Sequence, residues 1–332
     1  MSALQVGISG CDEAALRTLA AVAAHADCAV AALHDPDPVR LATARARCSA
    51  PIATEDFARF LASGVDFVVL GGSLADRAER LAAANAQAVP CLLRAPLAAD
   101  VATAEALAAS SEGLGLRLGL VVPGQDDPLL DQLRRMVADD WLGALVAVQA
   151  IAGDDALLQH PHELRPHPLL ERVAPLLHMT TWLCGKRAFE VTAQAVAGYG
   201  ADDDSVVATA RLRGGALATF HGSHTTRAHA IALHGTDGGI RIAGDRLWLR
   251  GKRAYRGSVF AYEHPGDEVV LDRTELAASL AANAPALEPL GRFARWLDDT
   301  DDFPCPAEQA LDDLRVIAAM QRSLASGARE RV

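Results

Sequence analysis

Short apolar runs alternate with helical patterns along the first 150 residues, and few folds accommodate that order. Glu13–Ala24, Leu74–Ala86 and Pro128–Val137 carry apolar residues at helical spacing. The runs that predict strands are Leu4–Ser9, Ala29–His34, Asp66–Leu70, Pro90–Leu93, Arg117–Val122 and Ala144–Ala150. Strand–helix alternation at this spacing favours a right-handed, mostly parallel sheet that is covered by helices on both faces.

The second half of the chain follows a different pattern. After the loop QHPHELRPHP, one amphipathic helix is expected over Leu170–Leu183, ended by Gly185. Strand patterns such as SVVATARLR follow, with a turn at GTDGG. Two further helices are expected, one with Leu287, Leu290, Phe293 and Leu297, and one with Leu311, Leu314, Ile317 and Leu324. Strands flanked by helices predict an α+β domain with an open, mainly antiparallel sheet.

The chain therefore divides into an α/β domain over residues 1–122 and an α+β substrate and oligomerisation domain over 123–332. The C-terminal helix is able to pack back on the first domain. The net charge of −11 argues against nucleic acid and an anionic membrane as partners. We find no run of 18 apolar residues, and MSALQVGISG lacks the basic start of a signal peptide, so a cytoplasmic protein is expected.

No metal is expected. The six cysteines are scattered singly and are expected to be small buried thiols. The loop with His160, His162 and His167 holds three imidazoles, but their spacing matches no zinc pattern.

The first strand ends in VGISGCDEAAL, where a Rossmann-type site would bind a pyrophosphate. Such a site needs a tight turn, a glycine at the pyrophosphate and then a small residue. Gly10 and Ala15 fit the first and third positions, but Asp12 occupies the middle one. At about 4 Å its charge would repel an anion by roughly 4 kcal/mol, close to a thousandfold in affinity. NAD is therefore possible but disfavoured; the alternative is that Asp12 simply caps the following helix.

Asp35 follows the second predicted strand, where an acidic residue would bind the ribose 2′-hydroxyl of a dinucleotide. Pro36 offers no cation for a 2′-phosphate, so NAD is favoured over NADP. The structural alternative is that Asp35 caps a helix starting near Pro36.

Several segments, taken in order, resemble the Gfo/Idh/MocA (glucose–fructose oxidoreductase/inositol dehydrogenase) family. In the first domain these are DPDPVR, VDFVVLGG and Pro96-Leu97-Ala98, which is similar to the end of an E-K-P-L-A motif. In the second they are His178 before WLCG, then GGALATF, GTDGGIRI and the final PAEQALDDLRVIAAMQRSLASGARERV. The resemblance implies NAD(P)-linked hydride transfer on sugars, cyclitols or related small molecules.

Carried over residue by residue, the resemblance implies a degenerate catalytic site. The family's acid/base lysine corresponds to Ala95, which has no proton to give. In the family's Asp-x-x-x-His pattern His178 remains, but the aspartate position is Ala174 and a later aspartate is Thr181. His178 is the candidate proton donor; the alternative is a buried structural histidine.

Three further positions are candidates for ligand binding: Arg77, Arg94 and Gln125. Arginines at strand ends can hold an anionic ligand by paired hydrogen bonds, although solvated surface arginines are the alternative.

Three functions stay open at this point. The first is a family member that has lost standard dehydrogenase activity and acts as a small-ligand-binding, regulatory or partner subunit. The second is an active NAD-dependent oxidoreductase with atypical catalysis through His178, and the third is a non-redox enzyme on the same fold. The expected ligand is a small polar or anionic molecule. A homo-oligomer, or a hetero-oligomer with a paralogue, is expected because the open sheet would otherwise expose apolar residues.

Overall fold

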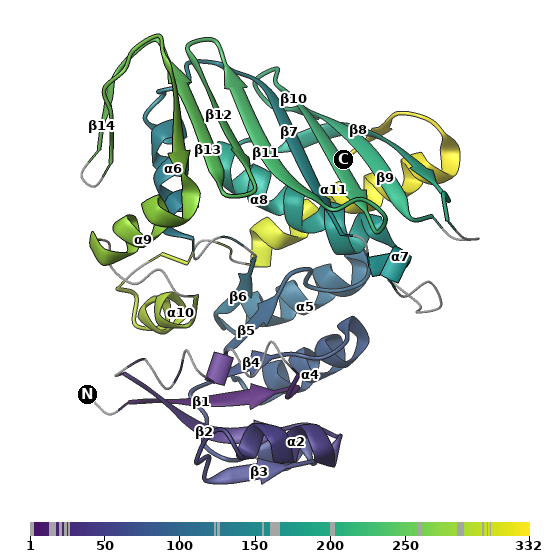
Figure 1. Ribbon diagram of the computed structural model, residues 1–332. Coiled ribbons are helices and arrows are strands. Elements are labelled where there is room, and N and C mark those ends of the chain that lie inside the picture. Colours follow the sequence, from purple (N-terminus) through teal and green to yellow (C-terminus); the bar gives the residue numbers. More distant parts are fainter. Residues whose placement is uncertain are drawn as a thin grey trace. The chain divides into compact units, whose positions relative to one another are not determined.

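A computed structural model describes the chain except residues 1–2, 13–17, 20–21, 23–24, 26, 123, 125–126, 155, 160–166, 200–202, 258–259, 284–288, 301, 304 and 306. The chain forms two compact units (Figure 1). The first comprises Met1–Val122 and Glu288–Leu314, and the second comprises Pro123–Leu287 and Arg315–Val332. Residues 288–314, which the sequence analysis places in the second domain, cluster with the first. One reason is that the Phe293 ring packs 5.2 Å from that of Phe67.

The first unit is built on a six-stranded sheet in the order β3-β2-β1-β4-β5-β6, and every pair in it is parallel. This confirms the predicted Rossmann-type α/β fold. The prediction lacks β3, because three residues are too few to show a periodic pattern. The strands are β1 (Leu4–Ser9), β2 (Cys28–His34), β3 (Ile52–Thr54), β4 (Phe67–Leu70), β5 (Cys91–Arg94) and β6 (Leu118–Val121).

Helices cover both faces of this sheet. On one face, α2 (Pro38–Arg45) and α10 (Pro289–Leu297) share a core cluster with Ile8 and Leu33. On the other, the cluster around Leu93 takes in residues of three helices. These are α3 (Phe57–Leu61), α4 (Leu74–Ala86) and α5 (Val101–Gly113). The bounds of α4 are as predicted, whereas much of the predicted helix Glu13–Ala24 lies outside the described residues.

The cap of α2 settles one alternative from the sequence. The Asp37 carboxylate accepts hydrogen bonds from the backbone N–H groups of Val39 and Arg40, so Asp37 is the N-cap. Asp35 is therefore not the cap of this helix.

The second unit holds a nine-stranded sheet in the order β16-β13-β12-β11-β7-β10-β9-β8-β17. Only β7 and β10 pair in parallel among its described strands, which confirms the open, mainly antiparallel sheet. The strand predicted at Ala144–Ala150 is β7 and belongs here, not to the parallel series of the first unit. The strands are β7 (Leu145–Gly153), β8 (Ala188–Val196), β9 (Ser205–Leu212), β10 (Leu217–Ser223), β11 (Ala228–Gly235), β12 (Gly238–Ala243), β13 (Arg246–Gly251), β16 (Glu268–Asp272) and β17 (Glu330–Arg331), with a separate ribbon of β14 (Tyr255–Arg256) and β15 (Ala261–Tyr262).

Among the described elements, helices cover one face of this sheet, which we call the inner face (Figure 1). The predicted helix Leu170–Leu183 is a π-helical turn, η1, followed by α8, and it ends at Gly185 with a φ of 60°, as expected of a C-cap. The prediction lacks α9. The helices are α6 (Pro128–Ala138), α7 (Ala156–Gln159), η1 (Leu169–Val173), α8 (Ala174–Cys184), α9 (Arg273–Asn283) and α11 (Ala307–Ser326).

The start of α11 contributes Leu311 and Leu314 to a core cluster of the first unit. The other face of the nine-stranded sheet, the outer face, carries exposed Val207, Thr209 and Arg211 between buried neighbours on β9. Within the described part of the chain, no helix is sufficiently long and apolar to cross a membrane.

Candidate functional site

The turn after β1 brings together strand ends of the first unit. Gly10 has a φ of 84°, and its N–H donates to the carbonyl oxygen of His34 over 2.8 Å. A Cβ at Gly10 would lie 2.6 Å from the backbone carbonyl carbon of Gly71, so no larger residue fits without a shift of the backbone. Gly10 therefore makes a tight turn, while its role in cofactor binding stays a prediction.

Two carboxylates, those of Asp12 and Asp35, lie near this turn. Burial, followed by the negative charges of Asp35 and Asp12, raises the pKa of the Cys11 thiol to about 12. An anion bound at the same turn would meet the same two charges. Ala15 lies outside the described residues, so its predicted packing role and the capping role of Asp12 are not tested.

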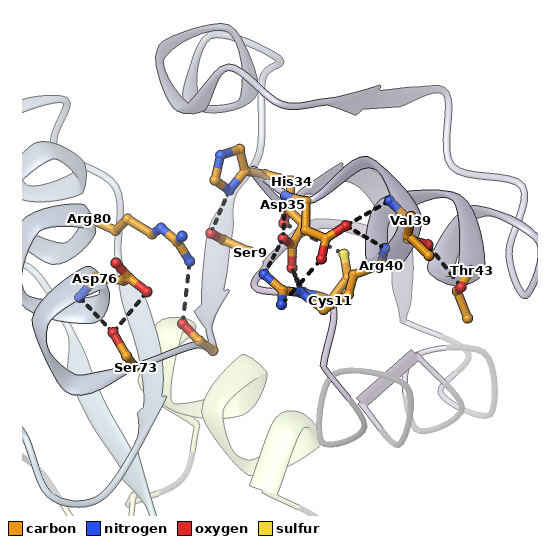
Figure 2. Close-up of polar contacts among 12 residues, drawn as sticks. Ser9, Cys11, His34, Asp35, Val39, Arg40, Thr43, Ser73, Asp76 and Arg80 are labelled. Carbon is orange, nitrogen blue, oxygen red and sulfur yellow. Dashed lines mark hydrogen bonds and ion pairs between the residues drawn. The ribbon is translucent and has the colours of Figure 1, made fainter.

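Asp35 is buried, and both its carboxylate oxygens are occupied (Figure 2). Oδ1 accepts from the Asp37 N–H at 2.8 Å and from Arg40 Nη2 at 2.9 Å. Oδ2 accepts from the Cys11 N–H at 2.7 Å and from Arg40 Nε at 3.1 Å. A carboxylate has about four acceptor sites. Four N–H donors therefore occupy all the acceptor sites of the Asp35 carboxylate, the group that is expected to bind the ribose.

These hydrogen bonds lower the pKa of Asp35. Burial raises its pKa, but the hydrogen bonds from Arg40, Asp37 and Cys11 outweigh burial and hold the pKa below its ordinary value. The prediction of NAD over NADP rested on the lack of a cation at Pro36. It overlooked Arg40, whose half-exposed guanidinium lies against Asp35.

The two arginine candidates of the first unit lie together. Arg77, on α4, is buried, and its Nη1 donates to the backbone carbonyl oxygen of Arg94 at the end of β5. Burial and then the positive charge of Arg94 lower the pKa of Arg77, whereas the charge of Asp12 raises it. Arg77 thus supports the backbone at a strand end, and Arg94 is the more exposed of the two.

The second unit holds a polar cluster that the sequence analysis missed: Asp154, Glu171, Arg172 and His224. The buried imidazole of His224 lies between two carboxylates, with Nδ1 at 3.8 Å from Asp154 Oδ1 and Nε2 at 3.5 Å from Glu171 Oε2. Arg172 forms ion pairs with both carboxylates. The cluster therefore brings one imidazole, one guanidinium and two carboxylates together.

The strand topology explains how this cluster forms. Asp154 directly follows β7 and His224 directly follows β10, and these two strands are parallel neighbours. Their carboxyl ends therefore lie at one edge of the sheet, while Glu171 and Arg172 come from η1. In the sequence, Asp154 and His224 each directly follow a strand pattern. That signal brings the two residues together only once β7 and β10 are known to pair.

His167 lies apart from this cluster and contacts Asp203, with 3.4 Å between Nε2 and Oδ2. His160 and His162 lie outside the described residues. Across the residues that the structure describes, no three His, Cys, Asp or Glu side chains are grouped to hold a metal ion.

Part of the second unit matches a known family of domains. Residues 130–241 match the family model described as the GFO/IDH/MocA C-terminal domain. The second unit contains a GFO/IDH/MocA C-terminal domain. The resemblance to the Gfo/Idh/MocA oxidoreductases is therefore confirmed. No curated protein sequence matches the chain significantly.

Solved structures support the same fold over the whole chain. An oxidoreductase from Agrobacterium radiobacter, in complex with NAD+, L-tartaric acid and magnesium, has a TM-score of 0.84 at 18% identity, covering 99% of this chain and 98% of its own. The WlbA dehydrogenase from Bordetella pertussis, in complex with NADH and UDP-GlcNAcA, has a TM-score of 0.83 at 18% identity, covering 100% and 98%. An aldose-aldose oxidoreductase from Caulobacter crescentus, complexed with glycerol, has a TM-score of 0.82 at 18% identity, covering 99% and 100%.

The positions carried over from the Gfo/Idh/MocA family can now be located. Ala95 follows β5 and precedes Pro96 through a cis peptide bond; its N–H donates to the Val121 carbonyl oxygen over 3.0 Å. His178 is buried on α8, and its carbonyl oxygen accepts from Thr181 Oγ1 at 2.9 Å. Gln125 lies outside the described residues. The roles of all three positions stay predictions.

Proposed function

We propose that this Gfo/Idh/MocA-type protein lacks standard NAD(P)-dependent hydride transfer and binds a small polar or anionic molecule as a regulatory or partner subunit. The observation that carries the proposal is the carboxylate of Asp35, whose two oxygens already accept four hydrogen bonds. A ribose hydroxyl would have to displace at least one of these donors.

Two further features support the proposal. The Asp12 carboxylate adds a negative charge beside the turn where a pyrophosphate would bind, so the residues of this turn do not fit a dinucleotide well. Ala95 occupies the position that corresponds to the family's lysine and cannot transfer a proton. A positioned acid or base contributes roughly 10²–10⁴-fold to rate, and its loss would leave little turnover.

A second candidate function is an active NAD-dependent oxidoreductase on a sugar, cyclitol or related polar substrate. Similar structures whose descriptions name NAD+ or NADH favour this candidate. His178 was the proton donor expected from the sequence, yet its side chain is only 3% exposed. His224, between Asp154 and Glu171, is an additional group with acid/base chemistry.

An absorbance assay separates the two candidates. The chain is incubated with NAD+ and, separately, NADP+ against a panel of sugars, sugar acids and cyclitols, and reduction is followed at 340 nm. The proposal predicts no rate above that of a protein-free control, together with a rise in melting temperature with at least one sugar acid, since a ligand that binds the folded state stabilises it. Sustained reduction of either cofactor would overturn the proposal.

We also propose a homo-oligomer, or a complex with a paralogue, formed through the part of the outer face that β9 and β10 carry. Val207 on β9 is 49% exposed and Leu217 on β10 is 55% exposed there, beside Thr209 and Thr219. A substitution Val207→Glu would place a charge in such an interface and is expected to reduce the mass measured by light scattering. A strictly monomeric wild-type mass at micromolar concentration would exclude the homo-oligomer.

The cytoplasmic location stays a prediction.

A further inference from the structure

The outer face of the nine-stranded sheet contains a hollow where β11, β12 and β13 lie side by side. Its volume is about 440 Å³, which is within the range of small-molecule sites. The side chains that line it include His234, Arg241, Trp248, Arg250 and Glu268, around Gly239, with Asp237 and Lys252 also at the hollow. All of these residues belong to the second unit, and none belongs to the sites described above.

The strand register places these residues around Gly239. His234 on β11 and Arg250 on β13 are its two direct cross-strand neighbours. Arg241, two residues further along β12, is opposite Trp248 and diagonal to Arg250. Diagonal neighbours across antiparallel strands are roughly 7–8 Å apart, within reach of arginine side chains. The floor of the hollow at Gly239 is thus bare backbone, with Arg250 beside it on β13 and Arg241 two residues along β12.

Alternation along the strands shows that these side chains point outward. Ile240, Ile242, Leu247 and Leu249 are buried on the inner face. Arg241 falls between Ile240 and Ile242, Arg250 follows Leu249, and both arginines are exposed. The Arg241 guanidinium carbon is 3.8 Å from the centre of the Trp248 ring, a cation–π contact that holds the charge in place.

The charges in the hollow do not cancel. Lys252 is paired with Asp237, with 3.1 Å between Nζ and Oδ1. Within the described part of the chain, neither Arg241 nor Arg250 has an ion-pair partner, although Glu268 is opposite Arg250 in the register. Two arginines therefore face one carboxylate, and the hollow has a net positive charge in an otherwise acidic protein.

We propose that this hollow binds the phosphate group of a small phosphate monoester. Guanidinium groups present paired N–H donors that match the oxygens of a phosphate. The missing side chain at Gly239 leaves room for the phosphate against the sheet. The volume also accommodates the rest of a molecule of sugar-phosphate size. The proposal is independent of the function proposed above.

Gly239 allows a sharp test. Its φ is outside the left-handed region, and a Cβ there would be 3.6 Å from the Leu233 carbonyl oxygen and 4.0 Å from His234 Nδ1, both ordinary contacts. Gly239→Val therefore places a side chain on the floor of the hollow, where the phosphate would bind, without backbone strain, and valine is favoured in strands. Gly238 differs, because a Cβ there would be 2.7 Å from the Arg250 carbonyl oxygen.

The experiment is calorimetric titration of the full chain with inorganic phosphate, glucose 6-phosphate and glucose. We expect both phosphates to bind and glucose not to bind. Arg250→Ala and Arg241→Ala should each weaken phosphate binding about tenfold, as expected for a hydrogen bond to a charged group. Gly239→Val should abolish binding while the melting temperature stays at or above that of the wild type.

The matched control is Arg246→Ala, which removes an exposed arginine from the outer face of the same strand but outside the hollow. Its phosphate affinity should equal that of the wild type. We take a dissociation constant of roughly 10 mM as the weakest affinity of interest. If no phosphate binds at that concentration, the proposal is overturned. So would binding that survives in Gly239→Val, or that falls equally in Arg246→Ala.

Discussion

Both units place charged groups where two parallel strands end, but they hold them differently. In the first unit, Cys11 and Asp35 follow close on β1 and β2, and the carboxylate is neutralised by backbone N–H groups and by Arg40. In the second, Asp154 and His224 follow β7 and β10, and the charges contact one another with η1 side chains among them.

The two regions differ in how far their charged side chains are exposed to water. The Arg40 side chain is 51% exposed, so water competes for its contact with Asp35. In the second unit the Arg172 side chain is 19% exposed and the His224 side chain 3%. The Asp154 and Glu171 side chains are 32% and 33% exposed, so this cluster is partly shielded from water and should cost more to break than the Arg40 pair. The same topology thus supports a turn with one neutralised carboxylate in the first unit and a cluster of mutually paired charges in the second.

The largest expected effect comes from removing one arginine from each region. Arg172→Met should lower the free energy of unfolding by about 3 kcal/mol, because it removes the guanidinium that pairs with both Asp154 and Glu171. Arg40→Met should cost no more than about 1 kcal/mol, because its partner keeps two backbone donors and the pair is half-exposed. Urea denaturation of the two variants measures both values. Equal losses would show that burial does not distinguish the two regions.

A smaller effect is expected in the pH dependence of stability. His34, whose Nδ1 is 2.9 Å from Ser9 Oγ, is buried behind the first turn. Burial and then the charge of Arg80 lower the pKa of His34 from 6.5 to about 4. Because the folded pKa is depressed, its contribution is fully present above pH 6.5 and is lost as the pH falls to 4. Roughly 1–3 kcal/mol of stability should disappear across this window.

His34→Asn tests this directly, since asparagine does not titrate. Its free energy of unfolding should vary less between pH 7 and 4 than that of the wild type, as measured by urea denaturation at each pH. His229→Asn, which replaces an exposed histidine, should keep the wild-type slope. An unchanged slope in His34→Asn would mean that this histidine does not carry the pH dependence.

The sequence predicts elements that have a clear local pattern. The bounds of α4 and the C-cap at Gly185 follow from spacing and from a single glycine. The place of β7 could not be read locally, because its pairing with β10 is formed by residues about 70 positions apart. Likewise, η1 cannot be distinguished from the α-helix that follows it, since both bury apolar residues at similar spacing.

The site residues divide in the same way. The turn at Gly10 follows from residue type, because a positive φ and a close backbone both require glycine. The filled carboxylate of Asp35 could not be predicted, since it depends on where the long side chain of Arg40 turns back. The cluster around His224 was missed because its members come from three separate segments of the chain.

The most direct test is calorimetric titration of NADH into the wild type and into Asp12→Gly and Asp12→Asn. Asp12→Asn removes the charge alone, whereas Asp12→Gly removes the side chain as well. If the carboxylate at the first turn disfavours a dinucleotide, the wild type will show no saturation at millimolar NADH. Asp12→Gly will then gain affinity, by up to about a thousandfold. Micromolar binding to the wild type, unchanged by either substitution, would contradict the account.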